Sequence, residues 1–171
     1  MAGPAGRATP ALAALATAGV HHVVHEYAAA PVVTGRDRDR RPHYGADTAD
    51  ALGIDPGRIF KTLVVSADGA LAVGIVPVAG ELDLKAIAAA LGARRATMAE
   101  PVEAERATGY VVGGISPLGQ RRQLPAVLDH SALAHPTILV SAGRRGMQVE
   151  LAPADLARLA GASLARIARD T

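Results

Sequence analysis

Cysteine is absent from this sequence of 171 residues, and aromatic residues make up only 2% of it. Without a thiol, the chain forms no disulfide bond, no thiolate metal site and no cysteine nucleophile. The shortage of aromatic residues leaves Ala, Val, Leu and Ile to fill the hydrophobic core. Long apolar runs are lacking too, since none approaches the roughly 18 residues of a membrane-spanning helix. The sequence therefore excludes thiol chemistry by the protein itself and predicts no membrane span.

The amino-terminal stretch from Ala8 to Val20 is only faintly similar to a signal peptide. Arg7 precedes it, but Pro10 and Thr17 interrupt it, so it is better interpreted as a first helix. We therefore expect a cytoplasmic protein.

Charge of one sign is also limited, because the net charge is only +2. No global field would hold a long nucleic acid. The basic residues do gather locally, at Arg36 to Arg41, at Arg121 and Arg122, and at Arg144 and Arg145. Such clusters suit contact with a few phosphates, although solvated surface is the simpler interpretation of any one of them.

The pattern of elements predicts a single α+β domain with a mixed sheet. Residues 1–8 are expected to form a flexible amino terminus, residues 9–171 one domain, and residues around 35–45 a loop insert. Strands are predicted at 22–27, 59–65, 70–78, 126–128, 137–141 and 147–151. Helices are predicted at 10–18, 48–52, 83–91 and 101–107, and from Pro153 onward.

Lysine is scarce, since Lys61 and Lys85 are the only two lysines beside 16 arginines. Lys61 lies inside the apolar strand predicted at 59–65, where a charge must reach water, find a partner or line a site. Strand alternation places it on the face of Ile59 and Leu63. From this pattern alone, an edge lysine that reaches solvent and a functional lysine are equally good interpretations.

Other chemical signals are weaker. His21, His22 and His25 have no carboxylate-rich or histidine-rich counterpart elsewhere, so we interpret them as structural and predict no metal. Gly113 and Gly114 provide backbone that a ligand can approach, and their N–H groups are suited to an oxyanion. A turn that needs positive φ explains the same two glycines. Tyr27 ends a predicted strand and is explained equally well as an aromatic residue at the rim of the core.

Several stretches together resemble the YbaK/EbsC family, the free-standing aminoacyl-tRNA deacylases related to the editing domain inserted in bacterial prolyl-tRNA synthetase. They occur in the family's order from Thr9 onward, and the Gly-Gly-Ile-Ser-Pro-Leu-Gly run with Lys-Thr-Leu upstream is highly specific. The main matching stretches are 60–65, 77–85, 90–93, 108–110, 112–120, 140–146 and 150–151.

This resemblance implies a mixed sheet that curls toward a barrel-like core flanked by helices. It also implies hydrolysis of cysteinyl-tRNA(Pro), in which the substrate's own thiol attacks its ester and leaves as a thiolactone. No cofactor is implied. The implied partners are the acceptor end of mischarged tRNA(Pro) and prolyl-tRNA synthetase.

The resemblance also implies residue roles. Lys61, Gly113 and Gly114 would be catalytic, and the implied substrate-binding residues are Tyr27, Thr62, Ser116, Pro117, Ser141 and Gln148. Gln148 occupies a position where the family often has an acidic residue, so it accepts a hydrogen bond but carries no charge. Two other functions fit the sequence: removal of alanine or another small residue through an activated water, and a non-catalytic module that binds aminoacyl-tRNA or the synthetase.

Overall fold

The computed structural model describes residues 8–29 and 44–170. Strands β2 (Phe60–Ala67) and β3 (Ala70–Pro77) form its central hairpin, and the turn between them has Asp68 and Gly69 at positive φ. The hairpin belongs to a five-stranded sheet of order β5-β2-β3-β6-β9, in which β3, β6 and β9 are parallel neighbours and the other pairs are antiparallel. The remaining strands of this sheet are β5 (Ala96–Met98), β6 (Ala126–Asp129) and β9 (Ala162–Ala165).

A second, antiparallel sheet has the order β1-β8-β7, and a third pairs β10 with β4. The strands are β1 (Val23–Glu26), β7 (Ile138–Arg144), β8 (Met147–Leu151), β4 (Gly80–Leu82) and β10 (Ala168–Asp170). The mixed sheets flanked by helices agree with the expected α+β fold, and in the described part of the chain they do not close into a barrel. A single parallel bridge between Ile59 and Leu139 joins the edge of β7 to the start of β2.

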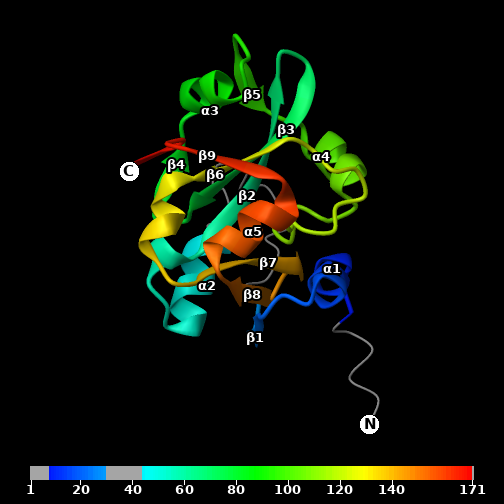
Figure 1. Cartoon of the computed structure of the whole chain (residues 1–171), viewed down its shortest axis with the longest axis vertical. Coiled ribbons are helices and arrows are strands. Elements are labelled where there is room, and N and C mark those ends of the chain that lie inside the picture. Colours follow the sequence, from blue (N-terminus) through cyan, green and yellow to red (C-terminus); the bar gives the residue numbers. More distant parts are fainter. Residues whose placement is uncertain (1–7, 30–43, 171) are drawn as a thin grey trace, which may run out of the picture.

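Helices lie at both ends of the sheets (Figure 1). In Figure 1, α3 lies beside β5 at one end, α1 lies near the β1-β8-β7 sheet at the other, and α5 crosses in front. The helices are α1 (Pro10–Ala18), α2 (Tyr44–Leu52), α3 (Leu84–Ala90), α4 (Pro101–Thr108) and α5 (Pro153–Ala160), with 3₁₀ turns at Pro56–Arg58 and His130–Ala134.

Capping residues explain where two of these helices begin. Thr9 caps α1 by accepting the Leu12 N–H, and Asp83 caps α3 by accepting the N–H groups of Lys85 and Ala86. Helix α2 begins at Tyr44, so residues 44 and 45 are helical and not part of the predicted loop. The rest of that loop, including the Arg36 to Arg41 cluster, lies outside the described residues.

The core is almost entirely aliphatic, as the composition requires. Its largest cluster is formed by the inner faces of β2, β3, β7 and β8 and by α1, where Phe60 is the largest fully buried side chain. A second cluster packs α3 against the other face of β2 and β3. Opposite faces of β2 therefore face different environments, and this separates Lys61 from its neighbour Thr62.

Candidate active site

Strand pairing brings Lys61, Ser141 and Gln148 onto one face of the molecule. The bridge between Ile59 and Leu139 is parallel, so Lys61 and Ser141 follow two residues later on the same faces of their strands. Gln148 pairs directly with Ser141 across β7 and β8, so its side chain shares that face. Helix α2 packs on this region through Ala49, which is buried together with Ile59 and Leu139.

A hydrogen-bonded group of polar side chains continues this face. The Tyr27 hydroxyl lies 2.9 Å from Thr48 Oγ1, and Gln148 Nε2 donates to the same hydroxyl at 3.3 Å. Gln148 is only 7% exposed, and its Oε1 has no hydrogen-bond partner among the described residues. Gln148 therefore offers an unused, buried acceptor beside Tyr27, which is costly unless a ligand uses it.

A pocket opens next to this group. Its described lining combines the end of β1, helix α2, the loop after α4 and the β7–β8 turn: Tyr27, Ala29, Asp47, Thr48, Gly113, Arg145 and Gly146. The Tyr27 N–H donates to the Gly146 carbonyl at 3.0 Å, which ties two of these segments together.

Lys61 is half-buried, and burial lowers the pKa of its ammonium from the ordinary value of 10.5, while the Glu81 carboxylate acts in the opposite direction. Desolvation disfavours the charged form of a lysine. Lys61 is therefore a cation held where its charge is less screened than at the surface, as electrostatic stabilisation of a reacting group requires.

The loop after α4 contains a tight turn from Val111 to Gly114, closed by a bond from the Gly114 N–H to the Val111 carbonyl at 2.9 Å. Gly113 is its third residue and has a φ of 92°, as a type II turn requires at that position. The two glycine amides are therefore not equivalent as oxyanion donors, because the Gly114 N–H already closes the turn. The Gly113 N–H has no partner among the described residues.

Gly114 instead allows close packing between two loops. A Cβ at Gly114 would lie 2.8 Å from Arg144 Cα and 2.9 Å from Arg145 N. Farther along, the Tyr110 hydroxyl donates to the Leu118 carbonyl at 2.7 Å, and burial raises the pKa of Tyr110 to about 12. The close approach at Gly114 packs the Gly113 turn directly against the β7–β8 turn.

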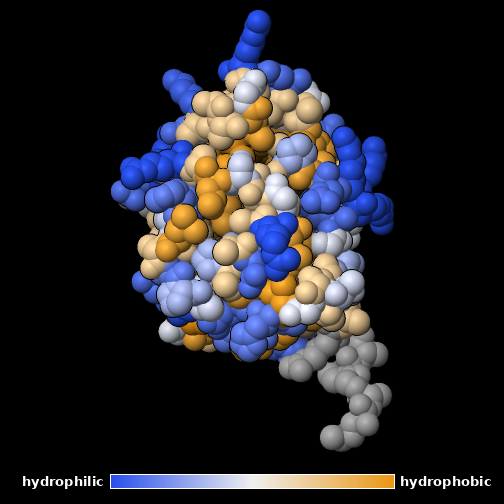
Figure 2. Space-filling view, viewed as in Figure 1, coloured by the Kyte–Doolittle hydropathy of each residue, from blue (hydrophilic) through white to orange (hydrophobic). Residues whose placement is uncertain are grey.

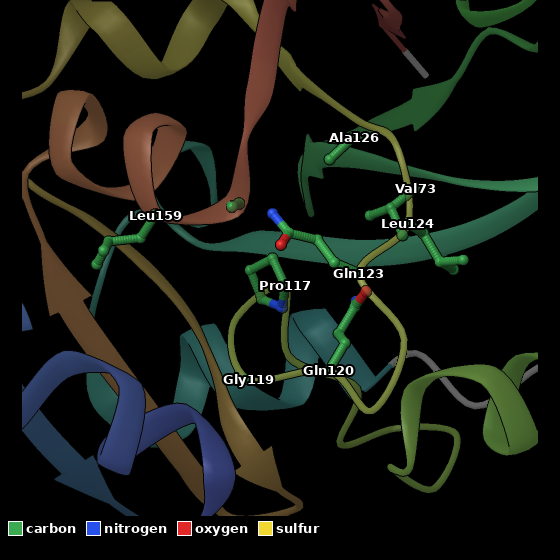
Figure 3. A pocket seen from close by; sticks show the side chains of 9 residues that line it. Val73, Pro117, Gly119, Gln120, Gln123, Leu124, Ala126 and Leu159 are labelled. Atoms are coloured by element: carbon green, nitrogen blue, oxygen red, sulfur yellow. The ribbon is translucent and has the colours of Figure 1, made fainter. Parts of the chain in front are cut away.

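Three predicted substrate-binding residues lie elsewhere. Thr62 shares its face of β2 with Phe60 and Val64, in the main core, and its Oγ1 is buried without a described partner. Ser116 is fully buried, and its Oγ accepts the Leu118 N–H at 3.2 Å within its own loop. Pro117 lines a different cavity (Figure 3).

The cavity beside Pro117 lacks the chemistry of a hydrolytic site. Figure 3 shows Pro117, Gln120 and Gln123 gathered near β3 and α5. None of the described residues that line this cavity is charged or titratable: Val73, Pro117, Gly119, Gln120, Gln123, Leu124, Ala126, Leu159 and Ala160. The pocket at Tyr27 is therefore the candidate active site.

Sequence reasoning did not single out Thr48 or Arg145 as site residues. The sequence pattern places Thr48 only in a short helix, and nothing in its local sequence shows that it meets Tyr27. Arg145 lies in the stretch matched to the family and in a basic cluster, and this was the only available signal. His25, which the sequence suggests is structural, lies with its Nε2 2.8 Å from Glu150 Oε1. Glu150 also forms an ion pair with Arg58 at 3.2 Å.

The described residues form neither a metal-ligand cluster nor a membrane-spanning helix. No group of three or more His, Cys, Asp or Glu side chains there is arranged to hold a metal ion. None of the described helices has the length and apolarity needed to cross a membrane.

Comparison with known proteins identifies the family. A model of the aminoacyl-tRNA editing domain matches residues 43–159. The chain is 43% identical over 127 residues to EbsC of Enterococcus faecalis, described as a candidate Cys-tRNA(Pro)/Cys-tRNA(Cys) deacylase, and the match covers 73% of this chain and 77% of that protein. A proline–tRNA ligase of Acidithiobacillus ferrooxidans is 39% identical over 88 residues, which are 52% of this chain and 15% of the ligase.

A solved structure agrees with these matches. The crystal structure of a candidate trans-editing enzyme for prolyl-tRNA synthetase superposes with a TM-score of 0.79 at 28% identity, covering 99% of each chain. The family model alone spans well over half of the sequence. The chain belongs to the aminoacyl-tRNA editing domain family.

Proposed function

We propose that this protein is a trans-editing deacylase that removes cysteine from mischarged tRNA(Pro). The observation that carries the proposal is the Gly113 N–H, which has no described partner and belongs to a residue lining the same pocket as Tyr27 and Thr48. An unpaired backbone donor at a pocket is suited to an ester oxygen that becomes negative during the reaction. The description of the Enterococcus faecalis relative supports cysteine as the amino acid.

The chemistry asks little of the protein. The substrate's cysteine thiolate attacks its own ester carbonyl, the C–S bond forms, and the negative charge moves to the carbonyl oxygen. As this intermediate collapses, the C–O bond to the ribose breaks, the ribose oxygen takes up a proton, and a thiolactone leaves. Positioning and charge stabilisation are then the protein's whole contribution, and the absence of cysteine from its own sequence is no obstacle.

Each residue of the candidate site has its own role in positioning the substrate or stabilising charge. Lys61 supplies positive charge, and the Gly113 N–H supplies a directed donor. Gln148 Oε1, the buried acceptor, is suited to the α-ammonium group of the aminoacyl ester. Tyr27 and Ser141 shape the face on which the amino acid lies, and Gly114 keeps the turn close to β7 and β8.

Choice of the tRNA is assigned to a partner. Because the net charge is only +2, we propose that prolyl-tRNA synthetase with its bound tRNA(Pro) supplies much of the selectivity for the tRNA. We propose the cytoplasm as the place where the two proteins act. The similarity to a segment of proline–tRNA ligases supports this pairing.

The test follows both ester loss and product for cysteinyl-tRNA(Pro) and alanyl-tRNA(Pro), with wild type, Lys61→Met and Lys85→Met. Lys85 is the matched control because it is the only other lysine and is exposed on α3. We expect rapid release of cysteine as thiolactone, a loss of roughly 10²–10³ in rate for Lys61→Met and no change for Lys85→Met.

Other outcomes would identify a different function. Release of free alanine at a comparable rate would make the protein a water-activating deacylase for small residues. Binding without turnover of either ester, even with prolyl-tRNA synthetase present, would leave a non-catalytic module. Selectivity among tRNA species that is unchanged by the synthetase would overturn the proposed division of work.

A further inference from the structure

The Arg145 guanidinium donates two hydrogen bonds to the Val112 carbonyl in the neighbouring loop. Its Nε and Nη2 both donate to the Val112 oxygen, at 3.2 and 2.7 Å. Arg145 lies in the β7–β8 turn, 33 residues along the chain from Val112, so these bonds join two separate loops. Bonds from a charged donor are roughly twice as strong as neutral ones, and here two of them converge on one oxygen in an exposed contact.

The Val112 carbonyl belongs to the same peptide unit as the Gly113 N–H. The peptide unit is planar, and in a trans peptide the C=O and N–H point in opposite directions. No cis peptide occurs among the described residues. Fixing the direction of the Val112 oxygen therefore fixes the direction of the Gly113 N–H as well.

This peptide has an alternative orientation that would remove the donor. Type I and type II turns differ by rotations of about 150–170° at the two dihedrals that flank the central peptide, so its N–H points to the opposite side in the other type. The φ of 92° at Gly113 corresponds to the type II form, and glycine can adopt either. The turn sequence alone therefore does not determine where the N–H points.

We propose that Arg145 is a positioning residue that holds the Val112–Gly113 peptide in the orientation presenting its N–H to the substrate. Resting on the proposed function, the inference assigns this donor's direction to the β7–β8 turn. A positive charge on the carbonyl also polarises the peptide and strengthens its N–H as a donor. Arg145 lines the pocket together with Gly113, so this coupling acts at the site itself.

The first measurement needs no substrate. Residual dipolar couplings and amide shifts of ¹⁵N-labelled protein report the orientation and polarisation of the Gly113 N–H in wild type, Arg145→Lys, Arg145→Gln and Arg158→Gln. Arg158 is the control, because it is exposed on α5 and pairs with Asp155. We expect a changed Gly113 coupling in both Arg145 variants, and Gly113 values like those of wild type in Arg158→Gln.

The second measurement separates kcat from KM for cysteinyl-tRNA(Pro). Loss of a directed oxyanion donor predicts a fall of roughly 10²-fold in kcat for both Arg145 variants. The lysine variant keeps the positive charge, so its defect reports lost geometry. Guanidinium ion added at a non-denaturing concentration should restore part of kcat to Arg145→Ala but none to Lys61→Met.

Failure of the inference and failure of the proposed function look different. An unchanged Gly113 coupling, or a raised KM with normal kcat in Arg145→Gln, would overturn the positioning role. A wild type that turns over no aminoacyl-tRNA would overturn the function, while the coupling data would still decide whether Arg145 sets the peptide.

Discussion

Lys61 combines a half-buried position with a charge that the proposed chemistry needs. Burial lowers its pKa, and the Glu81 carboxylate only partly opposes that effect. As pH rises, the Lys61 ammonium therefore loses its proton below the pH at which a solvated lysine does. Activity that depends on the Lys61 ammonium should therefore fall over the same range of rising pH.

We expect kcat for cysteinyl-tRNA(Pro) to decline with rising pH through an apparent pKa below 10.5, after correction for spontaneous ester hydrolysis. Lys61→Arg stays charged across this range, so its profile should lack the decline even if its rate is lower. The substrate thiol titrates equally in both proteins and cancels in the ratio of their rates. A decline at the same pH in Lys61→Arg would show that another group causes it.

At the scale of elements, one buried carboxylate ties the end of β6 to the carboxyl-terminal strand. Asp129 is 5% exposed and accepts the N–H groups of Ile167 and Ala168, both at 2.9 Å, and the Ser131 N–H at 3.1 Å. Burial alone would raise the Asp129 pKa, but the hydrogen bonds from Ser131, Ile167 and Ala168 outweigh it, and the pKa is lowered from 3.8.

A lowered pKa stabilises the fold above the ordinary value, and this contribution is lost as pH falls through the folded-state value below 3.8. Asp129→Asn places an amide against backbone donors, so the free energy of unfolding at pH 7 should fall by about 1.5–3 kcal/mol. Urea denaturation should show this difference at pH 7 and a smaller one near pH 3. The partly exposed Asp155→Asn is the control, and equal losses in both variants would contradict the argument.

The long elements could be predicted from sequence because their signals are local. The apolar runs around Asp68-Gly69 gave the β2–β3 hairpin, and Thr9 and Asp83 marked helix starts. Strands β4, β5, β9 and β10 were missed, because these short segments lack the adjacent branched apolar residues found in β1 and β6. Each is defined by its pairing partner in the tertiary structure.

The candidate site also has features that the sequence predicts and features that depend on the tertiary structure. The apolar strand around Lys61 and the glycine pair drew attention to these residues, and the family resemblance strengthened both choices. Two contacts depend on the tertiary arrangement of these loops. They are the bond from the Gly114 N–H to the Val111 carbonyl and the bonds from Arg145 to the Val112 carbonyl. Sequence offers no signal for such contacts, so the unequal roles of Gly113 and Gly114 emerge only in three dimensions.

At the scale of the whole molecule, the net charge is only +2, and basic residues gather in local clusters along the sequence. Figure 2 shows hydrophilic side chains around the rim of one face, with apolar side chains between them. Arg121 and Arg122 are exposed, and their backbone N–H groups donate to the carbonyls of Thr108 and Ala107 at the end of α4. This anchors the pair on the same loop that carries Gly113, and makes it a candidate contact for phosphates near the tRNA acceptor end.

The salt dependence of tRNA binding tests this contact. We expect the dissociation constant of uncharged tRNA(Pro) to rise with salt, and the slope of log K against log salt to shrink by about 1.5 in the double variant Arg121→Gln/Arg122→Gln, because two phosphate contacts are lost. Arg94→Gln/Arg95→Gln is the matched control: it removes the same charge from an exposed pair held by Asp68 at the β2–β3 turn. Counterion release depends on local contacts and not on net charge, so only the first pair should change the slope. Equal slopes in the two double variants would mean that the protein senses tRNA only through its overall charge, and the proposed synthetase partner would then have to supply all of the docking.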